Sequence, residues 1–197
     1  MDEIWAIVLA AGESKRMKVP KMLLPFGRET MIEKVIGNIA LSKVDKTLLV
    51  LGSYKEEIEA IVKNYPLNTC FNENFREGMY SSVKCGLNNL PEKIAAAMIF
   101  PGDQPFIEAG IINRVIDAYK KSGKGIVIPV YKKKRGHPLL IDSKYRNILV
   151  NARPEEGLRW LAYEYPEDVF EIRTNSTEIL RDFNTKEDYL NAINQNN

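Results

Sequence analysis

Apolar residues occur in short unbroken runs separated by segments with helical spacing. The longest runs have the length of strands that are buried on both faces of a parallel sheet. They predict strands at residues 4–11, 47–51, 95–100 and 125–130, with a weaker strand at 68–71 and late short strands at 169–172 and 179–183. Residues 21–27 are predicted to be an extended connector, and residues 131–141 a turn that leads into another strand.

Helices are predicted between these runs, where apolar residues recur every three or four positions. One begins near Thr30 and another near Ser53, because Glu33 and Glu56 stand three residues later and complete capping-box patterns. Further helices are predicted at about residues 79–90, 108–121, 157–165 and 186–193.

Strands and helices alternate through most of the chain. This order is typical of a doubly wound α/β fold, with a mainly parallel sheet and helices on both faces. Residues 131–183 break the alternation and leave room for a small antiparallel extension of the sheet. At 197 residues, without a linker or an internal repeat, the chain is expected to form a single domain over residues 1–197.

Composition narrows the class of protein. Hydrophobic residues make up 45% and charged residues 27%, as in ordinary globular proteins. The net charge of +2 argues against a nucleic-acid partner, and no apolar run approaches the ~20 residues that span a membrane. The acidic start at Asp2 and Glu3 does not resemble a secretory signal. Cys70 and Cys85 form no zinc pattern with His137 and fit a reducing compartment, so a cytoplasmic location is expected.

The segment at residues 4–21 is the first candidate site. A buried strand opens into Gly12, which permits a tight turn with positive φ and close approach of a ligand to the backbone. Ser14 offers a hydroxyl, and cations follow at Lys15, Arg16, Lys18 and Lys21. Such a loop at the carboxyl edge of a sheet suits a polyphosphate, although neither GxxxxGK[ST] nor GxGxxG is present. The alternative is a surface loop whose cations are merely solvated.

Two acidic segments are candidates for a metal site. Asp103 follows the buried run at 95–100, so its carboxylate should lie at the same sheet edge as Gly12 and could hold Mg²⁺. The segment Asp182-Phe183-Asn184-Thr185 is expected to lead from a strand end into a helix. The alternatives are a turn aspartate in the first case and a helix N-cap at Asn184 or Thr185 in the second.

Two further segments offer weaker evidence from chemistry alone. Gly78 and Ser82 stand at a helix start, where Ser81 or Ser82 could simply be a cap. The basic run at 132–135 precedes Gly136-His137-Pro138 and is most simply a solvated hairpin tip. His137 is the only histidine of the chain, and we do not assign it a role as general base.

The loop motif Leu9-Ala10-Ala11-Gly12-x-Ser14-x-Arg16-Met17-x-x-x-Lys21 resembles the signature of the nucleotidyltransferases of the molybdenum cofactor, in their cytidylyl branch. The family usually has glycine where this chain has Lys18. Four other segments resemble family motifs in the same order: Gly78-Met79-x-x-Ser82-Val83, Gly102-Asp103-Gln104-Pro105, Gly136-His137-Pro138 and the D-x-[DN]-T-x-E-D run at 182–188. Gly157-x-Arg159 is similar to the end of a further family element, and a helix-surface arginine is the slightly preferred alternative there.

The resemblance implies a Mg²⁺-dependent cytidylyltransferase that joins CTP to the molybdopterin cofactor and releases pyrophosphate. It implies roles in nucleotide binding for Leu9, Ala10, Ala11, Gly12, Ser14, Arg16, Lys21, Gly78, Ser82 and Asp103, with Arg16, Lys21 and Asp103 catalytic. It implies acceptor contacts at Gly136, His137, Pro138 and Arg159, and metal ligation by Asp103 with Asn184 or Asp182.

The same loop also serves cytidylyl- and uridylyltransferases of sugar or alcohol phosphates, which are the first alternative. The second is a non-catalytic chaperone that binds a nucleotide or cofactor. A molybdopterin acceptor would also allow transient contact with molybdoenzymes or their chaperones.

Overall fold

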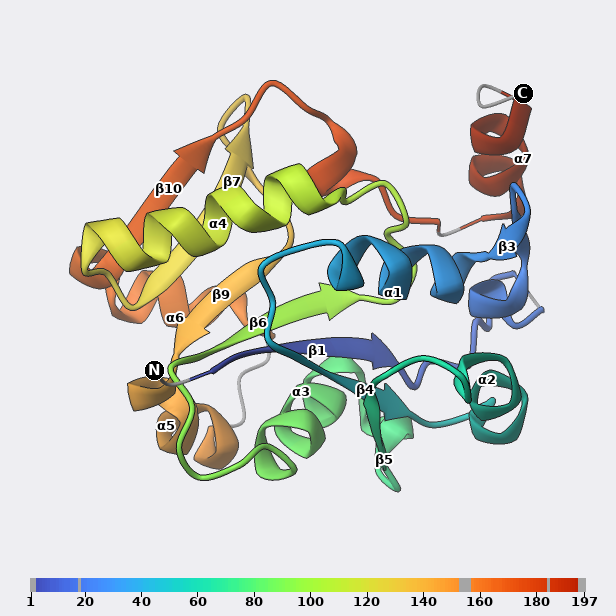
Figure 1. The fold of residues 1–197 in the computed structure, drawn as a ribbon, viewed down its shortest axis with the longest axis horizontal. Helices are drawn as coiled ribbons and strands as arrows, with labels where there is room; N and C mark the ends of the chain where they lie inside the picture. Colours follow the sequence, from blue (N-terminus) through green and yellow to red (C-terminus); the bar gives the residue numbers. More distant parts are fainter. Residues whose placement is uncertain (1–2, 18, 153–156, 184, 195–197) are drawn as a thin grey trace.

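The structure, a computed structural model, describes residues 3–17, 19–152, 157–183 and 185–194. Its centre is an eight-stranded sheet in the order β10-β7-β9-β6-β1-β4-β5, with β8 paired to β7 (Figure 1). The strands are β1 (Ile4–Ala10), β4 (Lys46–Leu51), β5 (Asn68–Phe71), β6 (Ala96–Pro101), β7 (Ile126–Tyr131), β8 (Lys134–Arg135), β9 (Leu139–Asp142) and β10 (Val169–Arg173). A separate antiparallel pair joins β2 (Pro25–Phe26) to β3 (Glu29–Thr30).

The sheet is mainly parallel, as the sequence predicts. Strand β1 pairs in parallel with β4 and β6, and β5 and β10 also join their neighbours in parallel. Strand β9 is antiparallel to both β6 and β7, and the short β8 is antiparallel to β7. The doubly wound class and its antiparallel extension are therefore confirmed. The carboxyl ends of β1, β4 and β6 point to the same edge (Figure 1).

Helices cover both faces of this sheet. One face packs against α1 (Met31–Ala40), α2 (Lys55–Val62) and α4 (Ala109–Ser122). The other packs against α3 (Met79–Asn88), α5 (Arg146–Asn151) and α6 (Arg159–Glu164). Helix α7 (Lys186–Asn194) lies beside the β2–β3 pair (Figure 1). None of the described helices is both long and apolar enough to cross a membrane.

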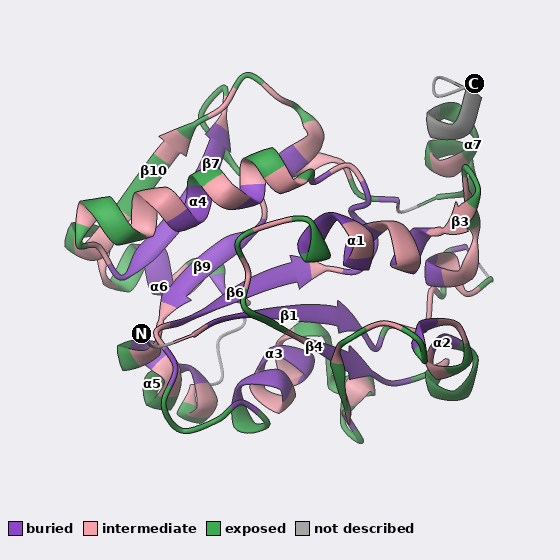
Figure 2. Ribbon diagram, viewed as in Figure 1, coloured by how far each residue is buried: buried purple, intermediate pink, exposed green. Residues whose placement is uncertain are grey.

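Strand β1 shows why its run is apolar without alternation. Ile4, Ala6, Val8 and Ala10 enter the core under α1 and α4, whereas Trp5, Ile7 and Leu9 enter the core over α3. Every residue of the strand is buried, as are most residues of β6 and β7 (Figure 2). A strand buried on both faces needs apolar side chains at every position, which explains the pattern.

The capping box predicted for the start of α1 is confirmed, and the one predicted for the start of α2 is wrong. The Thr30 hydroxyl accepts from the Glu33 N–H at 3.4 Å, and the Glu33 carboxylate accepts from the Thr30 N–H at 2.8 Å, so the predicted capping box forms. Helix α2 instead begins at Lys55 after Tyr54, with no side-chain cap, so the capping box predicted from Ser53 is absent. The loop explains this, because the Ser53 N–H is already bonded to the Ala11 carbonyl at 3.2 Å.

Three other segments differ from the sequence prediction. The connector at 21–27 is not simply extended, because it contains the 3-10 turn η1 (Lys21–Leu23) followed by β2. Residues 179–183 are not a strand: η5 (Glu178–Leu180) occupies the start and an irregular segment follows. Ile179 and Phe183 are apolar because each fills a buried position, Phe183 in a cluster with Phe26 and Phe106. Helix α5 has no counterpart in the prediction.

Candidate active site

The loop after β1 folds back onto its own polar side chains. The Ser14 hydroxyl accepts from the Lys21 N–H at 3.2 Å, and the Ser14 carbonyl accepts from the Met17 N–H at 3.0 Å. The positive φ that we expected at Gly12 falls instead on Ser14, at 51°. Among the described residues, a side chain at Gly12 would meet nothing within 4 Å, so the space above this part of the backbone is open to them, as a ligand would require. Lys18 lies outside the described residues.

Two glycines allow the ends of the neighbouring strands to approach the backbone at the end of β1 closely. The Gly102 N–H donates to the Leu9 carbonyl at 3.0 Å, and a Cβ at Gly102 would stand 2.9 Å from that same oxygen. A Cβ at Gly52, after β4, would overlap the Ala11 carbonyl. The ends of β1, β4 and β6 therefore meet at a distance that only glycine permits. Gly52 was not among the predicted residues, although a glycine directly after a buried strand is a usable signal.

Lys21, Asp103 and the segment before α7 come together at this edge. The Lys21 ammonium contacts the Asp103 carboxylate and donates to the Phe183 carbonyl at 3.3 Å. The two side chains are only 18% and 12% exposed. Asp103 and Phe183, which lie 82 and 162 positions after Lys21 in the chain, thus share its cation. The parallel sheet led us to expect Asp103 at this edge, whereas its contact with Lys21 was not predicted. The Phe183 carbonyl was not among the predicted groups, because its role depends on the backbone rather than on a side chain.

The donor atoms at this position suit a hard divalent cation. Mg²⁺ takes oxygen ligands, commonly one or two carboxylates together with substrate phosphates, and Asp103 and Asp182 both act electrostatically on the same side chain, His137. Asp103 already contacts a cation here, that of Lys21. Within the described part of the chain no cluster of three or more His, Cys, Asp or Glu side chains occurs. Asn184, the other predicted ligand, lies outside the described residues.

His137 stands between this centre and a large cavity. Burial lowers its pKa to about 4; the nearby Asp103 and Asp182 carboxylates raise the pKa, and Arg159 lowers it. Its backbone N–H donates to the Ile179 carbonyl at 3.0 Å, and its ring Nδ1 is buried with no hydrogen-bond partner among the described residues. The imidazole is therefore neutral near pH 7.

The cavity measures about 1120 Å³, above the ~300–1,000 Å³ of ordinary small-molecule sites. Its wall combines the start of α3 at Gly78 with Gly136, His137 and Arg159, so four predicted site residues line one space. Apolar side chains also line it, namely Ile126, Ile128, Leu139, Leu158, Leu161 and Leu180. Pro138 is buried directly beside this wall.

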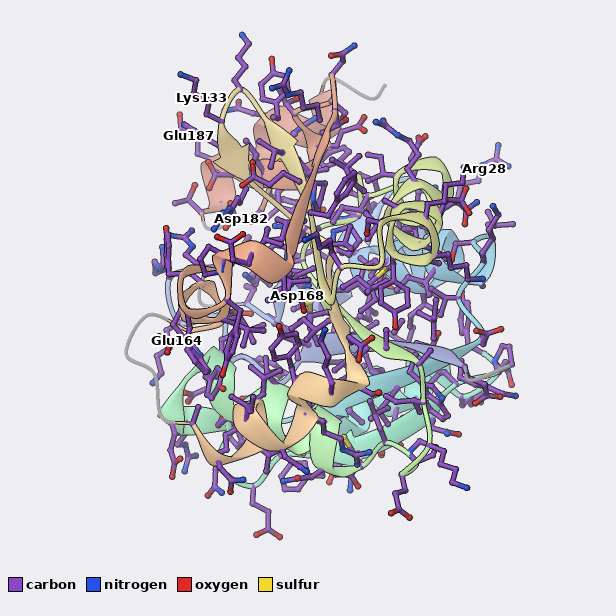
Figure 3. The ribbon with its side chains drawn as sticks, turned by 90° about the vertical axis from the view of Figure 1, so that its left-hand side faces the viewer. Arg28, Lys133, Glu164, Asp168, Asp182 and Glu187 are labelled. Carbon is purple, nitrogen blue, oxygen red and sulfur yellow. The ribbon has the colours of Figure 1, made fainter. Side chains whose placement is uncertain are left out.

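Cations stand at the rim of this cavity. The β7–β8 hairpin contributes Lys133, Lys134 and Arg135, and Figure 3 shows Lys133 at the hairpin tip with Asp182 on the chain below it. Arg135 donates to the Glu171 carboxylate at 2.8 Å and lies 5.5 Å from the ring centre of Tyr163. The basic run is thus an exposed hairpin tip and also part of the cavity wall, which its charge pattern alone did not reveal.

The backbone conformation at the start of α3 requires a glycine. Gly78 has φ 102° and ψ 177°, a conformation open to glycine alone, and neither Ser81 nor Ser82 caps the helix. The buried Ser82 hydroxyl instead accepts from the Asn72 amide at 3.0 Å. The structure therefore brings Gly78, and not the Ser82 hydroxyl, to the cavity. Asn72 was not among the predicted residues.

The remaining loop residues divide by exposure. Leu9 and Ala10 are buried at the end of β1, and Ala11 is buried directly after it. Arg16 is exposed on the loop, whereas Lys21 reaches Asp103.

An open loop and a carboxylate at the carboxyl edge of a doubly wound sheet, beside a cavity with a cationic rim, are typical of α/β proteins that bind phosphorylated ligands. Comparison with known proteins makes the class specific. The chain belongs to the family of the MobA-like NTP transferase domain, whose family model matches residues 6–169. It is therefore a member of a nucleotidyltransferase family.

Curated relatives include two molybdenum cofactor nucleotidyltransferases and a bifunctional protein. The chain is 24% identical over 193 residues to the molybdenum cofactor cytidylyltransferase of Escherichia coli (strain K12), covering 98% of this chain and 96% of that protein. It is 30% identical over 140 residues to a probable molybdenum cofactor guanylyltransferase of Methanosarcina mazei, covering 68% of this chain and 60% of that protein. It is 33% identical over 126 residues to the bifunctional protein GlmU of Acholeplasma laidlawii, covering 63% of this chain but only 27% of that protein.

Solved structures share the whole fold. Rv0371c from Mycobacterium tuberculosis H37Rv superimposes with a TM-score of 0.87 at 23% identity, over 98% of both chains. The same protein in complex with manganese gives a TM-score of 0.82 at 22% identity, again over 98% of both chains. The 4-diphosphocytidyl-2C-methyl-D-erythritol synthase of Anaerococcus prevotii gives 0.81 at 18% identity, over 98% and 96% of the two chains. These similarities establish the fold.

Proposed function

We propose that this protein transfers the cytidylyl group of CTP to the molybdopterin cofactor, giving the cytosine dinucleotide form of the cofactor and pyrophosphate. The observation that carries the proposal is the meeting of Lys21, Asp103 and the Phe183 carbonyl beside the cavity of about 1120 Å³. The similarity to the E. coli cytidylyltransferase over nearly the full length of both chains supports this particular reaction.

The preference for CTP rests on Ala11. The guanylyl branch of the family tends to have glycine at this position, and a methyl group narrows the space beside the base. Ala11 is buried on the α3 face of the sheet, the face on which Gly78 opens the cavity. We therefore expect the smaller pyrimidine to fit better than guanine.

The acceptor is proposed to occupy the cavity itself. An apolar wall suits a flat heterocycle, and the cations at the rim suit a phosphate. Arg159 and the hairpin residues Lys133 and Lys134 can supply that charge, while His137 lines the wall toward Asp103. The acceptor phosphate would then face the α-phosphate of the nucleotide.

The chemistry asks the protein chiefly for position and charge. An oxygen of the acceptor phosphate forms a bond to the α-phosphorus. The bond between the α-phosphorus and the oxygen that bridges it to the β-phosphate breaks, and that oxygen leaves with pyrophosphate. The nucleophile is already an anion, so no general base is required. Lys21 and Arg16 bind the triphosphate, and Lys21 stabilises the charge of the leaving group. Asp103, with Asp182 or Asn184, would hold Mg²⁺, which neutralises phosphate oxygens when bound; the manganese complex of the structural relative supports a divalent cation.

A sugar or alcohol phosphate is the second candidate acceptor. The 33% identity to GlmU and the fold shared with the erythritol synthase favour it specifically. A non-catalytic chaperone is less well supported, because a protein without chemistry has no need of Arg16, Lys21 and Asp103 together. A cytoplasmic location is proposed because Cys70 and Cys85 are both free thiols; contact with molybdoenzymes or their chaperones is the corresponding proposal for protein partners.

The test is a screen of the four nucleoside triphosphates with molybdopterin and Mg²⁺, with the dinucleotide product identified by mass spectrometry. We expect product with CTP and much less with GTP, and none from Asp103→Asn. Equal turnover of CTP and GTP would contradict the base preference. Pyrophosphate release with a sugar phosphate but not with molybdopterin would favour the second candidate. Intact CTP with every acceptor would favour the chaperone.

A further inference from the structure

The Lys21 ammonium is held at the position where a metal ion would bind. It contacts the Asp103 carboxylate and lies 3.3 Å from the Phe183 carbonyl, two hard oxygen groups of the kind that Mg²⁺ prefers. Both partners are mostly enclosed, with exposed fractions of 18% for the Lys21 side chain and 12% for that of Asp103. The contact is therefore less screened by solvent than an ordinary surface ion pair.

The segments that carry Lys21, Asp103 and Phe183 are each held in place. The Lys21 N–H is bonded to the Ser14 hydroxyl, and the Gly102 N–H next to Asp103 is bonded to the Leu9 carbonyl. Phe183 is 2% exposed, and its ring is packed among Phe26, Phe106 and Tyr189. The flexible part of the contact is the four-carbon stem of Lys21, which can swing its charge away while the oxygens stay in place.

We propose that Lys21 and the divalent cation compete for Asp103, so that Lys21 is an internal substitute for the metal until a triphosphate draws it away. This inference rests on the proposed function, because it takes Asp103 as the metal ligand and a nucleoside triphosphate as the substrate. An ammonium and a divalent ion repel one another strongly in an enclosed site, so both cannot hold the same carboxylate oxygen at full strength.

The competition makes the metal and the nucleotide bind cooperatively. A triphosphate offers Lys21 a more highly charged partner than Asp103, so nucleotide binding frees the carboxylate for the metal. By thermodynamic linkage the metal must improve nucleotide affinity by the same factor. The Asp103 carboxylate is thus paired with Lys21 before the nucleotide binds and with the metal ion afterwards. The metal ion therefore binds tightly only when the nucleotide is present.

The test is binding of Mn²⁺ to the intact protein, measured by the electron paramagnetic resonance signal of free Mn²⁺. Lys21→Met keeps most of the length of the side chain and removes its charge, and Lys15→Ala removes a loop cation that is 76% exposed and pairs with Glu13. Without nucleotide, we expect Lys21→Met to bind Mn²⁺ at least about tenfold more tightly than wild type and Lys15→Ala to be unchanged. The gain should disappear in Lys21→Met combined with Asp103→Asn.

A non-hydrolysable CTP analogue provides the second measurement. It should tighten Mn²⁺ binding to wild type more than to Lys21→Met, because the variant has no ammonium to displace. Equal or weaker Mn²⁺ binding by Lys21→Met alone would overturn the proposal, as would an equal gain in the variant that also lacks the Asp103 charge. Circular dichroism and thermal unfolding establish that each variant is folded. The titration needs no turnover, so failure of the proposed reaction would show separately, as absence of product in the screen above.

Discussion

The single histidine of the chain allows its protonation to be observed directly. Burial lowers the pKa of His137 from the ordinary 6.5 to about 4, and the carboxylates of Asp103 and Asp182 offset only part of that effect. We expect one Cε1–H signal in a ¹H–¹³C NMR spectrum of protein without a histidine tag, because the sequence contains one histidine. That signal should not shift between pH 8 and pH 5.5 and should titrate only well below 6.

The same pKa difference links stability to pH. Between pH 6.5 and 4 the unfolded chain binds a proton at His137 that the folded protein does not, so the free energy of unfolding rises with pH across this window. The contribution is complete above pH 6.5 and is lost as pH falls toward 4. Each unit of pKa difference corresponds to about 1.4 kcal/mol, which sets an upper limit of roughly 3.5 kcal/mol. Because His137 is only partly buried, as judged by its exposed area, the expected value is reduced to about 2 kcal/mol.

Chemical unfolding of wild type and His137→Gln at several pH values isolates this contribution. Carboxylates titrate in the same window, but they are common to both proteins, so the difference between the two curves reports His137. The wild-type curve should be steeper between pH 4 and 6.5, and the two should run parallel above pH 7. An NMR midpoint near 6.5 in the folded protein, or parallel curves throughout, would refute the argument from burial.

Two further predictions concern the loop and the core. Lys21→Ala should lower kcat by about 100-fold, on the order of 3 kcal/mol, a larger effect than its weakening of CTP binding, because its cation gains most as charge builds on the leaving pyrophosphate. Lys15→Ala is the matched control, and a raised KM with unchanged kcat would show that Lys21 acts only in ground-state binding. Gly37→Ala in α1, where a Cβ meets nothing within 4 Å, should stabilise the protein by roughly 0.5–1 kcal/mol. Gly86→Ala in α3, where a Cβ would stand 2.6 Å from Ile7 Cγ2, should destabilise it by about 1–3 kcal/mol. Chemical unfolding measures the free energy of unfolding of both variants, and changes of the same sign in the two would contradict the argument from packing.

Several features could be predicted from the sequence because their causes are local. The run at 4–11 is apolar at every position since a strand with a core on each face needs it. The Thr30 and Glu33 pair forms its capping box within one turn of backbone. Asp103 could be placed at the sheet edge because it follows a buried strand, and the alternation of elements implied that this strand runs parallel to β1. The family resemblance rested on motifs of the same local kind.

Other features depended on contacts between distant segments, which no local pattern encodes. Residues 179–183 resemble a strand in their spacing, yet Ile179 and Phe183 are apolar because each enters a separate buried environment. The sequence offers Arg16 and Lys21 as equivalent cations, and only the fold brings Lys21 to Asp103, 82 positions away. Gly37 and Gly86 are both helix glycines, and only packing against Ile7 distinguishes them. Sequence periodicity determines which face of an element is buried, whereas the order of strands in the sheet determines which residues that face contacts. That order therefore decided that Lys21 contacts Asp103, which residues line the cavity, and whether a Cβ fits at Gly37 and at Gly86.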